Sequence, residues 1–203
     1  MLWKALTQGE EVTATSEQLR SFSELYISDR ELTSRMSELF WFDCFVIDRC
    51  YGVSVREILD SVENLEAGEP HSGIKPATQF KNLPLKGLWH KHFFSAQFLM
   101  LNIANALGKN GVQKLVTEIF DEKQSPTITQ EMIDELAHRV THEPVEARDN
   151  DGKITGEWII FAKNGGKNYY LSVNTHAAGD QFIYDRIAEH CIRDFPDLLS
   201  WLP

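Results

Sequence analysis

Residues 157–173 read EWIIFAKNGGKNYYLSV. Two runs rich in aromatic and β-branched side chains, 157–162 and 169–173, flank the polar segment 163–167. That segment contains Asn164-Gly165, and an Asn-Gly pair between two such runs is a strong β-hairpin signal. The stretch therefore predicts two antiparallel strands joined by a tight turn.

A third strand is predicted just before this hairpin. Residues 145–148 follow Pro144, and the DNDG sequence at 149–152 is a strong turn signal. After the hairpin, Asp180 is the expected N-cap of a final helix. We therefore expect residues 144–203 to form a three-stranded antiparallel β-meander followed by a C-terminal helix.

Residues 1–143 predict mainly helices, because capping residues precede runs in which apolar side chains recur at helical spacing. The expected helices are Thr15–Ile27, Asp29–Tyr51, Ser54–Leu65, Pro84–Leu107, Gly111–Asp121 and Thr129–Thr141. Residues 66–83 are expected to form a long loop. Strands grouped after helices favour the α+β class. We expect one domain over residues 1–203, helical in its N-terminal two-thirds (1–143), with the meander and the last helix in 144–203.

Composition favours a soluble, cytoplasmic protein. The chain has 203 residues, of which 42% are hydrophobic, enough for a core without a metal or a disulfide. Its longest apolar stretch, near residues 93–107, is interrupted by polar residues and is shorter than the ~20 residues of a membrane span. The N-terminus is too polar for a signal peptide. The three cysteines form no CxxC motif and are expected to be reduced.

The net charge of −10 is unevenly distributed. Residues 1–68 contain 13 acidic and 6 basic side chains, whereas residues 69–111 contain five lysines and one glutamate. The acidic first third argues against nucleic-acid and membrane binding, because like charges repel phosphate. It favours docking to a basic protein partner. The first hypothesis is therefore an acidic protein-binding module, such as an immunity or antitoxin-type inhibitor. The oligomeric state does not follow from the sequence.

An alternative hypothesis is a small hydrolase or nuclease-like enzyme using His176, Asp180, His138 and His142. His176 and Asp180, at a predicted strand end and helix start, are a candidate catalytic acid–base pair. His138 and His142, four residues apart on a predicted helix, share a face and are candidate metal ligands. No HExxH motif accompanies them. The simpler interpretation of each pair is a helix cap and a turn residue, or solvated histidines.

A third set of candidate residues lies in the basic segment. Lys86, His90 and Lys91 are a candidate anion-binding edge. On the predicted helix, His90 and His92 would point about 200° apart, which excludes their binding one small ligand together. His92 falls on the apolar stripe and is expected in the core. The sequence has no GxxxxGK[ST] or GxGxxG motif, and we expect no cofactor.

Overall fold

The computed structural model describes residues 1–7, 9–68, 76–93, 107–120, 127–150, 157–175 and 178–202, with only the backbone of 141–150. These residues form an α+β fold with seven α-helices and two sheets, of two and four strands. The predicted helical N-terminal two-thirds and the three-stranded meander are wrong. The chain divides into two compact units, residues 1–95 with 156–203 and residues 96–155. The expectation of a single domain stays a prediction.

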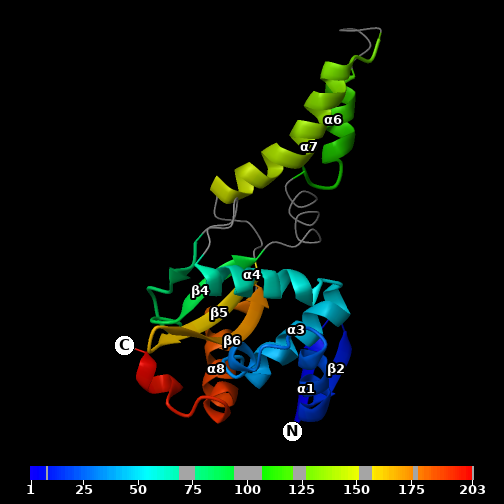
Figure 1. Ribbon diagram of the computed structural model, residues 1–203. Helices are drawn as coiled ribbons and strands as arrows, with labels where there is room; N and C mark the ends of the chain where they lie inside the picture. The colour runs from blue at the N-terminus through cyan, green and yellow to red at the C-terminus, as the bar shows by residue number, and fades with distance from the viewer. Residues whose placement is uncertain are drawn as a thin grey trace. The chain divides into compact units, whose positions relative to one another are not determined.

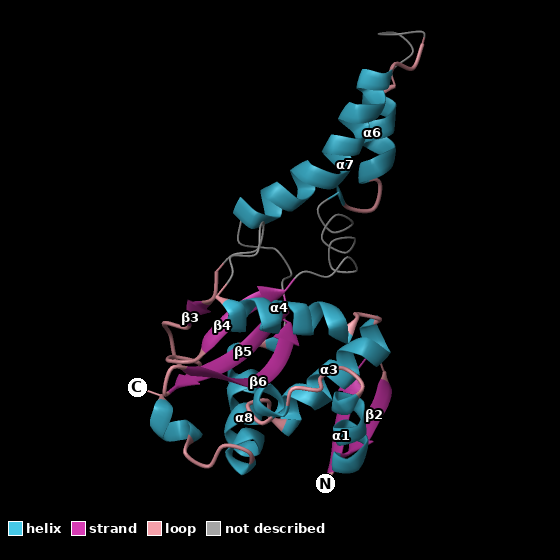
Figure 2. Cartoon of the chain, viewed as in Figure 1, coloured by secondary structure: helices cyan, strands magenta, loops and turns pink. Residues whose placement is uncertain are grey.

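The main sheet of the first unit has four antiparallel strands in the order β3-β4-β5-β6. Figure 1 labels β4, β5 and β6, and Figure 2 also labels β3. Its strands are β3 (Thr78–Gln79), β4 (Trp89–Phe93), β5 (Glu157–Asn164) and β6 (Lys167–Thr175). The predicted hairpin corresponds to β5 and β6. Its two turn residues, Gly165 and Gly166, have φ of 56° and 77°, and a tight turn with two positive φ angles strongly favours glycine. The hairpin therefore forms the centre and one edge of this sheet.

The N-terminus forms a second sheet that the sequence analysis did not predict. Strands β1 (Leu2–Thr7) and β2 (Glu10–Thr15) pair antiparallel. Trp3, Val12 and Ala14 are buried while their chain neighbours are exposed or partly exposed. This alternation with a period of two is the strand pattern. The polarity of the segment argues only against a signal peptide, whereas the alternation of its apolar residues is the signal for a strand.

Five α-helices and two 3-10 helices complete the described part of the first unit. They are α1 (Ser16–Glu24), α2 (Arg30–Thr33), α3 (Glu38–Tyr51), α4 (Val55–Ala67), α8 (Asp180–His190), η2 (Cys191–Arg193) and η3 (Leu198–Trp201). The prediction of a single helix over Asp29–Tyr51 is wrong, because residues 34–37 separate α2 from α3 and are not α-helical. The Ser37 side chain caps α3 by accepting a hydrogen bond from Phe40 N at 3.0 Å. It also donates to the Leu171 carbonyl at 2.7 Å, which ties the start of α3 to β6.

Helix α3 is the centre of the core. Leu39, Phe40, Trp41, Phe42 and Cys44 are all buried, so the helix is apolar on nearly every side. It packs against β6 on one side and against α1 on another. Burial of an aromatic side chain of this kind contributes about 2–3 kcal/mol. Helix α4 contacts β4 and lies across the sheet (Figure 2).

Residues 89–93 form β4 instead of the middle of the helix predicted over Pro84–Leu107. The sequence WHKHF alternates in the same way as a strand, and the pairing Trp89↔Phe161 to Phe93↔Glu157 places it beside β5. The apolar stripe that supported the helix prediction ran from Leu85 to Leu107, and its residues from Ala96 to Ile103 lie outside the described residues. A second difference is β3, a short strand within the predicted loop 66–83.

The second unit contains α6 (Gly111–Ile119) and α7 (Gln130–Asn150). Arg139 of α7 donates to Glu118 of α6 at 2.9 Å. The strand predicted at residues 145–148 is wrong, because α7 continues through them. Glu146, Ala147 and Arg148 are good helix formers, and this preference prevails over the break expected at Pro144. Within the described residues, no helix is long and apolar enough to cross a membrane.

Candidate functional site

Strand β4 carries two histidines on the same face. Alternate residues of a strand point to the same side, so His90 and His92 are neighbours there. Their ring centroids are 5.5 Å apart. The opposite directions expected for them on a helix do not apply, because the segment is a strand.

Aromatic rings surround this histidine pair. The Phe80 ring lies 4.4 Å from the His90 ring, and the Trp158 ring lies 5.1 Å from His90 and 6.4 Å from His92, between ring centroids. Trp158 is the cross-strand partner of His92 on β5. Both histidines are partly exposed, whereas Trp158 is buried. We call Thr78, Phe80, His90, His92 and Trp158 the β4 histidine cluster.

His90 is held in a defined environment within the cluster. Its Nε2 atom lies 3.1 Å from the hydroxyl oxygen of Thr78, the residue directly opposite it on β3. Its Nδ1 atom is buried and has no hydrogen-bond partner among the described residues. Burial lowers the pKa of His90 below its usual range. The neutral ring is therefore favoured near pH 7, and a neutral imidazole can accept a proton.

The opposite face of the same strands carries two buried ionisable residues. Lys91 is 6% exposed, and burial lowers its pKa. Glu157, opposite Phe93 at the start of β5, is 2% exposed, and burial raises its pKa to about 8. Lys86 is exposed in the turn before β4. The three predicted anion-binding residues Lys86, His90 and Lys91 therefore do not share one face.

The structure does not test the predicted catalytic pair or the predicted metal-binding pair, because one member of each lies outside the described side chains. Asp180 is exposed and is the first residue of α8, after the N-cap Gly179, whereas His176 lies outside the described residues. His138 is exposed on α7 in the second unit, and the side chain of His142 is not described. The described part of the chain contains no group of three side chains suited to hold a metal ion.

A buried polar network links α3, β6 and α8. Asp43 accepts hydrogen bonds from Ser172 Oγ at 2.5 Å and from the Val173 amide at 3.1 Å. Its other carboxylate oxygen accepts from Arg186 at 2.6 Å. Ser172 Oγ in turn accepts from the Asn174 side chain at 2.8 Å. These bonds satisfy a carboxylate that would otherwise be costly to bury.

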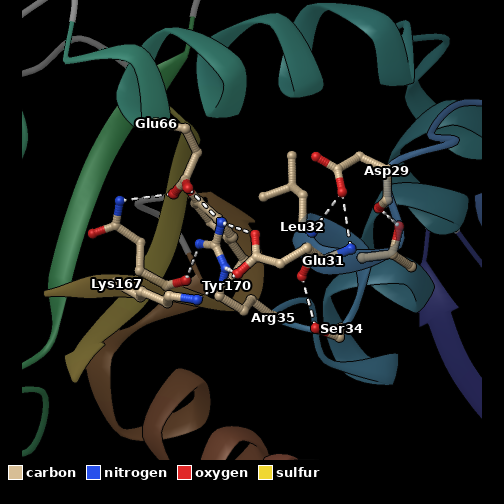
Figure 3. A network of polar contacts seen from close by, with 10 residues as sticks. Asp29, Glu31, Leu32, Ser34, Arg35, Glu66, Lys167 and Tyr170 are labelled. Atoms are coloured by element: carbon tan, nitrogen blue, oxygen red, sulfur yellow. Dashed lines mark hydrogen bonds and ion pairs between the residues drawn. The ribbon is translucent and has the colours of Figure 1, made fainter. Parts of the chain in front are cut away.

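A second network centres on Arg35 and is structural (Figure 3). The buried Arg35 guanidinium donates to Glu31 and Glu66 and to the Asn168 carbonyl, at 2.5–3.1 Å. Tyr170 also donates to Glu66, at 2.6 Å. The hydrogen bonds from Arg35 and Lys167 lower the pKa of Glu31 to about 2. Because its members come from α2, α4 and β6 and bond one another, we interpret this network as a clasp between these elements.

Sequence reasoning missed Thr78, Phe80 and Trp158 as members of the β4 histidine cluster. The alternation in WHKHF was the available signal, because in a strand it puts two imidazoles on one face. The partners of that face come from β3 and β5, which lie far apart in the sequence. Comparisons with protein family models, with curated proteins and with solved structures find no match to this chain.

Proposed function

We propose that this protein is a small hydrolase, nuclease-like in its chemistry, which cleaves a phosphate ester at the β4 histidine cluster. The observation that carries this proposal is the pair of partly exposed imidazoles, His90 and His92, on one face of β4. This proposal uses other catalytic groups than the His176 and Asp180 pair proposed from the sequence.

Two adjacent imidazoles suit acid–base catalysis. Two imidazolium ions at this separation would repel each other, so the pair favours one charged and one neutral ring. A neutral ring accepts the proton of an attacking water or hydroxyl, and a protonated ring donates one to the leaving oxygen. Burial lowers the pKa of His90, so we propose His90 as the base and His92 as the acid.

The surroundings of the cluster favour an anionic substrate with a flat group. Lys81 and Lys86, both exposed, lie in the connection between β3, which carries Thr78, and β4, which carries His90. Phe80 is partly exposed and offers a ring on which a base can stack. The negative net charge of the chain disfavours long nucleic acids, so we propose a nucleotide or a short oligonucleotide as substrate.

Hydrolysis assays with single variants test this function. The substrates are short single-stranded RNA and DNA oligonucleotides and a chromogenic phosphodiester. We expect His90→Ala and His92→Ala each to reduce kcat by about 10²-fold or more, with retained folding by circular dichroism. His138→Ala, in the second unit, is the matched control and should leave kcat unchanged. Equal activity of the two cluster variants and the wild type would exclude this site.

The acidic first third supports a second function, the binding of a basic protein, as in an immunity or antitoxin-type inhibitor. Of its 13 acidic side chains, six have a basic partner among the residues that the structure describes. Among the others, Glu10, Glu17 and Glu24 are exposed on β2 and α1. These three groups are available to attract a cationic surface.

Charge reversal distinguishes this second function from the first. The probe is a purified basic protein whose gene lies next to the gene of this protein. The triple variant Glu10→Lys/Glu17→Lys/Glu24→Lys should weaken its binding and reduce the dependence of binding on salt. Glu118→Lys, in α6, is the control. If the triple variant binds as the wild type does, the acidic first third is only a solubilising surface.

A further inference from the structure

The strand register extends the face of the β4 histidine cluster across the sheet to β6. His92 is paired with Trp158, and Trp158 with Asn174, so these three residues form one row. His90, Ile160 and Ser172 form the next row on the same face. Strands lie about 4.8 Å apart, so Asn174 is about 10 Å from His92 along the row.

The Asn174 side chain is oriented by the buried Asp43 network. Its amide nitrogen donates to Ser172 Oγ at 2.8 Å, and Ser172 donates to Asp43. One N–H of the Asn174 amide is used in this way. Asn174 is partly exposed, so its second N–H remains available to a ligand on this face.

Arg186 joins the same network with most of its donors unused. It donates to Asp43 through one terminal nitrogen, at 2.6 Å, and makes no other hydrogen bond within the described residues. A guanidinium has five N–H donors. The Arg186 side chain is only 19% exposed, and its Cζ atom lies 5.4 Å from the centroid of the Phe182 ring. A fixed, partly buried guanidinium with free donors matches the geometry of an oxyanion.

We propose that Arg186 of α8 and Asn174 of β6, which the buried Asp43 and Ser172 link, form a binding site for a phosphate-type oxyanion. The site deepens the proposed hydrolase function, on which its biological meaning rests, because an enzyme that cleaves phosphate esters has to hold a phosphate group of its substrate. Asp43 and Ser172 act as positioning residues, because they reach the ligand only through Arg186 and Asn174.

Binding of inorganic phosphate, measured by titration calorimetry on the full chain, tests the site. The wild type should bind phosphate saturably. The double variant Asp43→Asn/Arg186→Gln removes both charges of the buried pair and keeps their shapes, so it should fold and bind phosphate at least about tenfold more weakly. Arg186→Lys keeps the charge without the planar fork and should also weaken binding. The exposed Arg56→Gln is the matched control and should bind as the wild type does.

Two outcomes overturn the site: no saturable binding to the wild type, or equal binding by the wild type and the Arg186 variants. The variants His90→Ala and His92→Ala separate this proposal from the proposed function. If they bind phosphate normally and no ester is hydrolysed by the wild type, the hydrolase function fails and the anion site stands. If hydrolysis depends on the histidines but phosphate binding is insensitive to Arg186, only the anion site fails.

Discussion

Replacement of the buried Glu157 by glutamine should make the first unit more stable at neutral and alkaline pH. The carboxyl group is 2% exposed, its Oε2 atom has no hydrogen-bond partner among the described residues, and its pKa is raised to about 8. In the unfolded chain the same group ionises near 4.5. The unfolded state therefore loses its proton first as pH rises, and this favours unfolding. Glutamine has the same shape and cannot ionise.

The size of the effect follows from the two pKa values. Between 4.5 and 8, each pH unit costs the folded state about 1.4 kcal/mol relative to the unfolded chain. The penalty in the wild type is thus about 3 kcal/mol at pH 7 and about 5 kcal/mol at pH 9. Glu157→Gln should remove this pH dependence of the free energy of unfolding. The new amide can also change the stability by an amount that is the same at every pH.

Urea unfolding at pH 4.5, 7 and 9, followed by tryptophan fluorescence, measures the difference. All five tryptophans belong to the first unit, so the signal reports on that unit. The stability gap between Glu157→Gln and the wild type should widen by about 3 kcal/mol from pH 4.5 to 7. For the exposed control Glu24→Gln, the free energy of unfolding should change with pH as it does in the wild type. If the free energy of unfolding of Glu157→Gln has the same pH dependence as that of the wild type, the Glu157 carboxyl group is not buried with a raised pKa and the reasoning is refuted.

Other substitutions should have distinct effects, each measured by urea unfolding. Arg35→Ala should cost about 3 kcal/mol, because it leaves the partly buried Glu66 without its cation. Ser37→Ala should cost about 1–2 kcal/mol through loss of the α3 cap. Gly166→Ala should lower the free energy of unfolding by about 1 kcal/mol, because Gly166 has a φ of 77° that alanine adopts only with strain. Gly68 has a φ of 69°, so Gly68→Ala should also be destabilising and is not a neutral control. The wild type should lose stability as pH falls below about 6.5, because the His90 ring takes up a proton more readily in the unfolded chain than in the folded one. His90→Gln should reduce this change of the free energy of unfolding with pH.

The sequence predicted local signals well and long-range pairings poorly. The capping box at Thr15 and Gln18 is present in α1, and the Asn-Gly signal correctly located the β5–β6 hairpin. Capping and tight turns depend on neighbouring residues, so one sequence contains enough information. Strand β4 depends on β5, which lies much further along the chain, and the short sequence of β4 also fits a helix. Tertiary pairing decided between the two, and it is not visible in local propensity.

The candidate site was harder to predict for the same reason. His90 was recognised as a candidate, but the helix prediction separated it from His92. The importance of Glu157 comes from its burial, which no feature of the sequence around it indicates. The acidic surplus of residues 1–68 was visible, but the partners that neutralise Glu31 and Asp43 include Lys167 of β6 and Arg186 of α8, near the other end of the chain.

The pairing of Phe93 with Glu157 has a consequence for how this chain can change in length. Cross-strand partners in an antiparallel sheet have their Cα atoms only about 5 Å apart. Strand β4 ends at Phe93 and β5 begins at Glu157, so the two residues that flank the intervening segment are neighbours in the sheet. The entropy of closing such an excursion grows only with the logarithm of its length. A longer segment, a shorter one or an unrelated module between these two residues should therefore leave the pairing of β4 with β5 intact.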